Sequence, residues 1–305
     1  MDLVWLIMAT PQQFLIIGYP ERLASDHTVL LTAARQLSVR ADLIAPSRLT
    51  LLIESDRADR VLLDGNQLSG LGLAVLPRGV NRAWPLIRQI CEVLERHGAR
   101  IVPGIAAIDA CADKVVTTQL LAAAGVPVLP TAAVVAGEGV SAESLALRNH
   151  ETVIKPARGS KARGVEQHPT LADAAHSLHS GRALIDKMVD HQVVQPLASS
   201  AGIDYRVVVA AGQVVSITRR RALGQSFLTN RGEIEHTDID PDEVPEIAEA
   251  GRAAARALGL DFGGIDVIEH VGRAVVLEAN AWPGLAPGAL GTRLADALAG
   301  VAMLD

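Results

Sequence analysis

Three oxygen-bearing side chains near the end of the sequence are spaced so that they could hold a divalent cation. Glu278 and Asn280 lie two residues apart in a β-rich run, and such residues project from the same face of a strand. Asp266 lies in the preceding run, 265–269, which we expect to pair with residues 274–278 as a hairpin. Carboxylate and amide oxygens suit Mg²⁺, usually together with phosphate oxygens. These three residues predict a magnesium site. The alternative interpretation is an ordinary strand face exposed to solvent.

Two lysines and a glycine-containing loop could bind an anion beside these oxygens. Lys155 ends a predicted strand and is followed by the loop 158–165, whose backbone N–H groups could turn toward a phosphate. Lys114 follows Asp113 at the start of a predicted helix, where the helix dipole does not favour a positive charge. Solvated lysines and a structural turn are the alternative interpretation. The loop lacks the Gly-Lys-Ser/Thr ending of a Walker A motif.

Arginines on a later β-rich segment could recognise a carboxylate or a phosphate. Arg206 follows Asp204 on the first strand of a hairpin that we expect to turn at 211–212, and residues 219–221 are consecutive arginines on the second strand. Guanidinium groups bind carboxylates and phosphates through two hydrogen bonds. Because side chains alternate along a strand, at least one of the three arginines is expected to be surface charge.

The elements expected around these residues change in character along the chain. The first third alternates between predicted strands at 14–19, 41–45, 73–79 and 99–102 and predicted helices at 26–37 and 84–97, with a small hairpin at 61–68. Later segments are a helix at 113–124, a strand at 152–155, a helix capped by Thr170, a hairpin at 205–218, a helix at 241–258 and the last hairpin. Strands separated by helices predict a parallel sheet covered on both faces.

Composition excludes several classes of protein. The 305 residues are 49% hydrophobic, which provides ample material for a core, and a formal net charge of −6 makes nucleic acid an unexpected partner. Cys91 and Cys111 form neither a disulfide framework nor a zinc pattern, so we expect two buried, reduced thiols in a cytoplasmic protein. The apolar runs within 1–19 are too short to span a bilayer and lack a signal-peptide pattern. We therefore expect neither a membrane segment nor export.

The order of these features resembles the ATP-grasp superfamily, and most closely its RimK-like carboxylate–amine ligases. The resemblance covers roughly residue 73 to the C-terminus, and its most specific segments are 113–127, 204–209, 264–267 and 277–284. It implies an ATP-grasp fold of mixed α/β and α+β class. A doubly wound parallel-sheet domain at 1–107 would precede two α+β lobes, at 108–192 and 193–305, that enclose the nucleotide.

The resemblance also implies a role for each matched residue. The positions that would contact ATP are Lys114, Lys155, Gly159, Ser160, Gly164 and the hinge residues Gln195, Pro196 and Leu197. The positions that would hold two Mg²⁺ ions, with Mn²⁺ as an alternative, are Asp266, Glu278 and Asn280. The positions that would face the reaction centre are Arg206, Arg220 and Asn230.

The sequence departs from the family pattern at several of these sites. The hinge carries residues 196–197, Pro and Leu, where relatives usually have an acidic and an aromatic residue. The segment 198–202 lacks the acidic residue expected to hold the ribose hydroxyls, which leaves Ser199 or Ser200 as a substitute. The segment after Asn230 is shorter than in close relatives and lacks their histidine, which affects the choice of acceptor.

The implied activity is ATP-dependent formation of an amide (C–N) bond between a carboxylate and an amine of small amino-acid-like molecules. Transfer of the γ-phosphoryl group would give an acyl phosphate, and attack by the amine would release phosphate beside ADP. A version in which one molecule supplies both groups and closes a ring is equally compatible. The alternative from another class is a regulatory protein that binds ATP without turnover. Expected partners are small molecules rather than nucleic acid or membrane. The sequence leaves open whether the chain forms a homo-oligomer.

Overall fold

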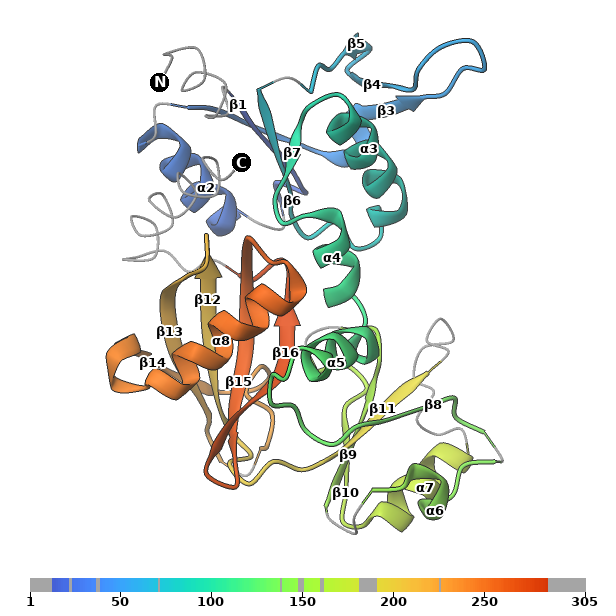
Figure 1. Ribbon diagram of the computed structural model, residues 1–305, viewed down its shortest axis with the longest axis vertical. Helices are drawn as coiled ribbons and strands as arrows, with labels where there is room; N and C mark the ends of the chain where they lie inside the picture. The colour runs from blue at the N-terminus through green and yellow to red at the C-terminus, as the bar shows by residue number, and fades with distance from the viewer. Residues whose placement is uncertain are drawn as a thin grey trace.

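The computed structural model describes residues 13–21, 24–36, 39–70, 72–137, 139–147, 151–159, 162–180, 191–224 and 226–284. Figure 1 shows the described strands gathered into sheets along the long axis of the molecule, with a blue parallel sheet at the top, an orange and gold sheet in the middle and a green and yellow sheet at the bottom. The mixed α/β architecture predicted from the sequence is confirmed.

The N-terminal part is built on a parallel sheet. Its order is β2 (Arg40–Ile44), β1 (Gln13–Ile17), β6 (Leu73–Pro77) and β7 (Arg100–Ile101). Phe14 and Ile16 of β1 pack on one face with helix α2 (Ala24–Gln36), whereas Leu15 and Ile17 pack on the other with helix α3 (Trp84–Arg96). The expected parallel sheet with both faces covered is therefore present.

The central part is an antiparallel sheet that provides one wall of the site. Its order is β10 (Glu166–His168), β9 (Thr152–Pro156), β11 (Gln192–Pro196) and β8 (Ala132–Val134). Helices α6 (Ala142–Leu145) and α7 (Leu171–His179) share a core with β9 and β11. Thr170 caps α7, as predicted. The expected lobe boundary at 192–193 falls inside β11, which pairs with β9 along its length.

The C-terminal part is an antiparallel sheet with a helix on one face. The order is β14 (Ile234–Ile239), β13 (Gln213–Ala222), β12 (Ile203–Ala210), β15 (Phe262–His270) and β16 (Arg273–Asn280). Val207 and Val209 pack toward helix α8 (Pro245–Leu258), whereas Val208 and Phe262 belong to the core of the N-terminal sheet. One face of this sheet is thus shared between the N-terminal core and the site described below.

Two short helices connect the N-terminal sheet to the rest of the molecule. They are α4 (Ile105–Cys111) and α5 (Lys114–Ala123), which appear in green between the sheets in Figure 1. A small sheet of β3 (Leu49–Leu52), β4 (Arg60–Leu63) and β5 (Asn66–Gln67) contains the predicted hairpin at 61–68. Within the described ranges, no helix is long and apolar enough to cross a bilayer.

The structure corrects some expected elements. The helix expected at 241–258 is divided into a 3₁₀ turn, Pro241–Glu243, and α8, because Pro245 disfavours helical geometry at Val244, whose φ is −133°. Short polar strands such as β10 and β14, and the helix α4, were not predicted. The strands β10 and β14 contain few apolar side chains, and the 7 residues of α4 are nearly all apolar, so none of the three shows a clear periodicity.

The two cysteines are unpaired thiols. Cys91 is buried as expected, whereas Cys111 is partly exposed. Burial raises the pKa of each thiol to about 12, so both stay protonated at neutral pH.

Close packing of α8 on β12 gives the first prediction. A Cβ atom at Gly251 would lie 2.5 Å from Cγ1 of Val207, too close for any side chain. We expect Gly251→Ala to lower the free energy of unfolding by about 1–3 kcal/mol in urea denaturation, because overpacking exceeds the gain in helix propensity. Adding Val207→Ala to the Gly251→Ala variant should restore part of the lost free energy of unfolding, because it removes the clashing methyl groups. Unchanged stability of Gly251→Ala would contradict this account.

Candidate active site

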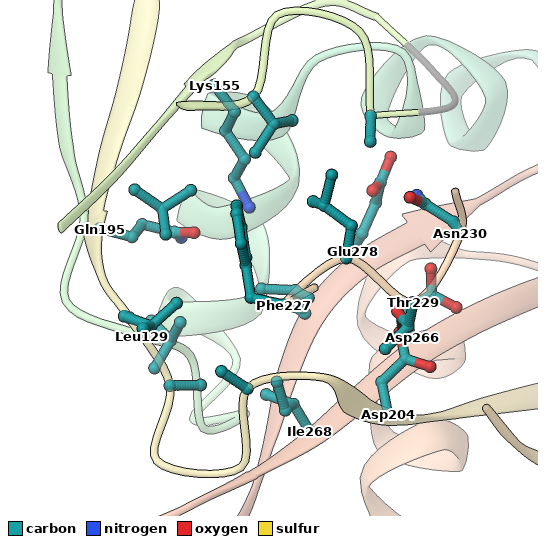
Figure 2. A pocket seen from close by; sticks show the side chains of 18 of the residues that line it. Leu129, Lys155, Gln195, Asp204, Phe227, Thr229, Asn230, Asp266, Ile268 and Glu278 are labelled. Carbon is teal, nitrogen blue, oxygen red and sulfur yellow. Dashed lines mark hydrogen bonds between the residues drawn. The ribbon is translucent and has the colours of Figure 1, made fainter. Parts of the chain in front are cut away.

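A pocket lies between the central sheet and the C-terminal sheet. Residues of β9, β11 and the loop after β9 line one side, and residues of β12, β15, β16 and the segment 227–230 line the other. Figure 2 shows apolar Leu129 and Ile268 toward one end and Glu278, Asp266 and Asn230 toward the other. The pocket therefore joins an apolar slot to a strongly charged end.

The register of the last hairpin places two carboxylates on the pocket face. Asp266 pairs directly with Glu278, whereas Val267 pairs with Val276, so Leu277 is an extra residue in β16. Without this β-bulge, Glu278 would point to the opposite face, since side chains alternate along a strand. Asp266 and Glu278 both line the pocket, as the sequence predicts for neighbouring ligands.

Asn280 follows on the same strand face, at the end of β16. It pairs with Gly264, and it is half-buried. Among the described residues, it is not part of the pocket lining. The expected three-oxygen set thus has two members in the pocket and a third one step farther along the strand.

Two arginines hold the buried carboxylates of this face. Arg206 donates to both oxygens of Asp266, from Nε at 2.5 Å and from Nη2 at 3.0 Å. Arg220 donates to both oxygens of Asp204, at 2.7 and 2.6 Å, and its Nη2 lies 3.0 Å from Oδ1 of Asp266. Thr229 adds a hydrogen bond from its hydroxyl to Asp204. Alternating acids and bases therefore offset the cost of burying four charges.

The two carboxyl groups differ in their titration. Burial raises the pKa of Asp204 above its ordinary value, against the opposing effect of the Arg220 hydrogen bonds. Burial also disfavours the charged form of Asp266, but Arg206 and Arg220 together hold its pKa below the ordinary value. Asp266 is therefore the firmly ionised member of the pair.

Two lysines face the charged end of the pocket. Lys155 is 8% exposed, and burial lowers its pKa to about 8 despite the attraction of Glu278. The Nζ atom of Lys114 lies 3.5 Å from Oε1 of Glu278 and 3.3 Å from the carbonyl oxygen of Gly159. Both lysines line the pocket, so the structure brings together the cations and carboxylates that the sequence singled out.

The position of Lys114 depends on contacts at the start of α5. Asp113 caps this helix by accepting from the N–H of Val115 at 2.9 Å. Its other oxygen accepts from Nε of Arg158 and lies beside Nε2 of His191, both at 3.1 Å. The N–H of Lys114 also donates to the carbonyl of Ala157 at 2.9 Å. These contacts fix α5 against the ends of β9 and β11.

The three hinge residues line the pocket, but some of their polar groups are already hydrogen-bonded within the protein. Gln195, Pro196 and Leu197 line the pocket, but Gln195 donates from Nε2 to the hydroxyl of Thr131 at 2.8 Å. The N–H of Leu197 donates to the carbonyl of Glu151 at 2.7 Å, and proline has no N–H. The backbone donors of residues 196–197 are therefore unavailable to a ligand.

The two serines expected to replace a ribose-binding acid are engaged elsewhere. Ser199 accepts from the N–H of Val271 at 2.9 Å, and Ser200 donates to the carbonyl of Glu269 at 2.6 Å. Both contacts lie at the turn between β15 and β16, and neither serine is among the described residues that line the pocket. The structure thus gives no support to that expected substitution.

The remaining predicted residues occupy mixed positions. Gly159 and Asn230 line the pocket, whereas Gly164, with φ of +72°, shapes the loop without lining the pocket. Ser160 lies outside the described residues. Arg206 and Arg220 contact acids of the pocket instead of forming its lining in the described chain.

Sequence reasoning gave no role to several residues that the structure places at the site. Asp204 was noted only as a neighbour of Arg206, and Thr229 and His191 were not singled out. The charged residues at 204 and 206 could have indicated a role for Asp204 at the site. No sequence pattern indicated a role for His191, because only the fold brings it to Asp113.

The oxygen donors fit a hard divalent cation. Glu278 and Asn280 share a strand face with Asp266, and Gly264 opposite Asn280 adds no side chain there. No group of three or more His, Cys, Asp or Glu side chains in the described part of the chain could hold a metal. Two carboxylates and one amide would leave coordination positions for phosphate oxygens or water, as Mg²⁺ prefers.

Comparisons of the sequence with known proteins identify a family. The family model of the RimK-like ATP-grasp domain matches residues 111–300. A probable alpha-L-glutamate ligase of Mannheimia succiniciproducens is 31% identical over 84% of this chain and 86% of its own length. A tetrahydromethanopterin:alpha-L-glutamate ligase of Methanosarcina acetivorans is 29% identical over 63% of this chain and 59% of its own.

Solved structures show the same fold at lower identity. D-cycloserine synthetase DcsG has a TM-score of 0.67 and 21% identity, covering 95% of this chain and 99% of that one. A RimK domain ATP-grasp protein from Sphaerobacter thermophilus has a TM-score of 0.64 and 19% identity, covering 95% of this chain and 98% of that one.

The ion-pair network gives a prediction about stability. Replacing Arg220 by Met leaves two buried carboxylates without their shared partner, so we expect the free energy of unfolding to fall by about 3 kcal/mol in urea denaturation. Arg221→Met, at an exposed position on the same strand, is the matched control and should change it by less than about 0.5 kcal/mol. Equal effects of the two variants would contradict a buried network.

Proposed function

Because the chain belongs to the RimK-like ATP-grasp family, we propose that it is an ATP-dependent ligase that joins a carboxylate to an amine and releases ADP and phosphate. The observation that carries the proposal is the pocket itself, in which two lysines and three carboxylates lie at the end of an apolar slot. This arrangement suits a ligand with a flat apolar base at one end and a polyanion at the other.

The charge balance of the pocket favours a polyanion. Arg206 and Arg220 neutralise Asp204 and Asp266, as their hydrogen bonds indicate. The charged lining residues that remain in the described chain are Lys114, Lys155, Arg163 and Glu278, an excess of positive charge. We assign the two lysines to the phosphates of ATP, together with Gly159, Ser160 and Gly164 of the loop after β9.

The apolar end is assigned to adenine. Val153, Ile268 and Leu277 come from the two facing sheets, Leu129 comes from the segment between α5 and β8, and all four line this end with the hinge. Since the N–H of Leu197 is already used, we expect recognition of adenine to rest on packing and on the backbone groups that stay available.

Magnesium is assigned to Asp266, Glu278 and Asn280, in two ions for which Mn²⁺ can substitute. Bound Mg²⁺ would neutralise phosphate charge during phosphoryl transfer. The ionised state of Asp266, held by Arg206 and Arg220, suits a ligand of this kind.

The proposed reaction proceeds through an acyl phosphate. A carboxylate resists attack because its negative charge repels a nucleophile and oxide is a poor leaving group. Transfer of the γ-phosphoryl group from ATP to a carboxylate oxygen gives ADP and an acyl phosphate. The amine then attacks the acyl carbon, loses a proton and expels phosphate. We assign Arg206, Arg220 and Asn230 to the reaction centre at the charged end of the pocket. The two arginines contact Asp266 there, and Asn230 lines the pocket.

The substrates are proposed to be small amino-acid-like molecules. Two of the relatives are named for ligation of alpha-L-glutamate, so glutamate is the first amine to test. The product mass separates condensation, which adds the mass of the partner less water, from cyclisation, which removes water from one molecule.

An activity measurement tests the proposal directly. The protein is incubated with ATP, Mg²⁺ and pools of amino acids including glutamate, and ADP and phosphate are measured. We expect one pool to stimulate ADP release, and Glu278→Gln to reduce kcat at least about 100-fold, since it removes a charged ligand. Glu269→Gln, at an exposed position of the same hairpin, should retain activity. Tight ATP binding without turnover in every pool would instead favour the regulatory alternative.

The pKa of Lys155 gives a prediction about pH. The protonated ammonium group binds phosphate, and burial lowers its pKa to about 8, so the free protein loses this charge as the pH rises through 8. We expect the dissociation constant for ATP to rise about fivefold between pH 8 and pH 9, as the protonated fraction of Lys155 falls. Lys155→Arg, which stays charged, should show a flatter profile in calorimetric titration. A wild-type affinity that does not change with pH would contradict this role.

A further inference from the structure

An arginine of the N-terminal sheet is buried against the turn that follows β16. Arg78 comes directly after β6, and its backbone N–H donates to the carbonyl of Ile17 at 2.8 Å, which fixes its main chain to β1. The residue is only 2% exposed. Its Nη2 donates to the carbonyl oxygen of Pro283 at 2.5 Å, and its guanidinium carbon lies 5.7 Å from the centre of the Phe262 ring.

The same turn is held from two other sides. A Cβ atom at Gly264 would lie 2.7 Å from Cβ of Pro283, so the proline ring packs directly on β15. Trp282 meets Trp84 of α3 edge to face, with ring centres 5.7 Å apart and planes at 78°. The turn is therefore clamped among β6, β15 and α3.

The clamped turn begins where the proposed metal ligands end. Asn280 is the last residue of β16 and pairs with Gly264, the residue on which Pro283 packs. Glu278 precedes Asn280 by two residues on the same strand face. A shift of the Pro283 carbonyl would therefore be transmitted to both oxygen donors through a short stretch of chain.

We propose that Arg78 is a positioning residue of the magnesium site: by holding the Pro283 carbonyl, it fixes the end of β16 and thereby the orientation of Glu278 and Asn280. The inference rests on the proposed function. A buried guanidinium is costly unless it is used, and an apolar side chain would fill the same space at lower cost. A charge-assisted hydrogen bond from a rigid sheet fixes a carbonyl more firmly than packing does.

The test separates metal binding from nucleotide binding. Arg78→Met keeps the length of the side chain and removes its donors, and Arg78→Lys keeps a charged donor. Calorimetry measures ADP binding without Mg²⁺ and at increasing Mg²⁺. Mg²⁺ is expected to raise the affinity for ADP. In Arg78→Met, we expect the Mg²⁺ concentration at which half of this rise is reached to be about ten times higher than in the wild type. The affinity for ADP without Mg²⁺ should be unchanged. Arg78→Lys should be intermediate, and it also serves if the Met variant does not fold.

A second measurement needs no ligand. Hydrogen exchange at the amides of Ala281, Trp282 and Gly284 should be at least about tenfold faster in Arg78→Met than in the wild type, because the clamp is loosened. Leu178→Ala is the matched control, since Leu178 of α7 is fully buried in the core of the central sheet, which contains neither Trp84 nor Trp282. It should lower the melting temperature while leaving the Mg²⁺ requirement and these exchange rates unchanged.

The outcomes distinguish the two proposals. If Arg78→Met matches the wild type in Mg²⁺ requirement and exchange rate, or if Leu178→Ala shifts both equally, the role of Arg78 is overturned. If the wild type does not bind ADP with Mg²⁺, the proposed function fails. In that case exchange at residues 281–284 still decides whether Arg78 holds the turn.

Discussion

One extra residue in β16 determines which face of the C-terminal sheet carries Glu278. Val276 and Ala279 both pack toward α8 although they are three residues apart, because Leu277 bulges between them. The bulge turns Glu278 to the face of Asp266. A second irregularity, between Val208 and Val209, shifts β13 in the same way, so that Asp204 pairs with Arg220. A regular ladder would instead have brought Arg219 opposite Asp204.

The face created by these two bulges carries opposite charges in alternation. Each buried carboxylate of the network accepts from a guanidinium that another strand supplies, so the interactions bind β12, β13 and β15 to one another as well as compensating charge. The lysines approach from the opposite wall, on β9 and α5. The pocket is thus an interface between two sheets, and its chemistry requires both of them.

Much of this arrangement was accessible from the sequence, because the decisive patterns are local. Strands separated by helices predicted the parallel sheet, β-rich runs on either side of a turn predicted the hairpins, and the order of charged motifs led to the pocket lysines and carboxylates. The suggested role of Ser199 or Ser200 at the ribose gains no support, because both hydroxyl groups have partners in the turn between β15 and β16. The role of Asp204 and the proximity of His191 to Asp113 likewise depend on register and long-range packing, which no local pattern encodes.

The shared core between the two larger sheets has a consequence for dissecting the protein. Phe14, Ile16 and Leu76 of the N-terminal sheet pack in one cluster with Val208 and Phe262, which occupy the same sheet face as the acidic network. Excising the first hundred residues would uncover this apolar surface immediately beside the pocket. The leading domain therefore cannot be trimmed away or exchanged for an unrelated one as a detachable module, and any chimera must carry its complementary partner surface with it.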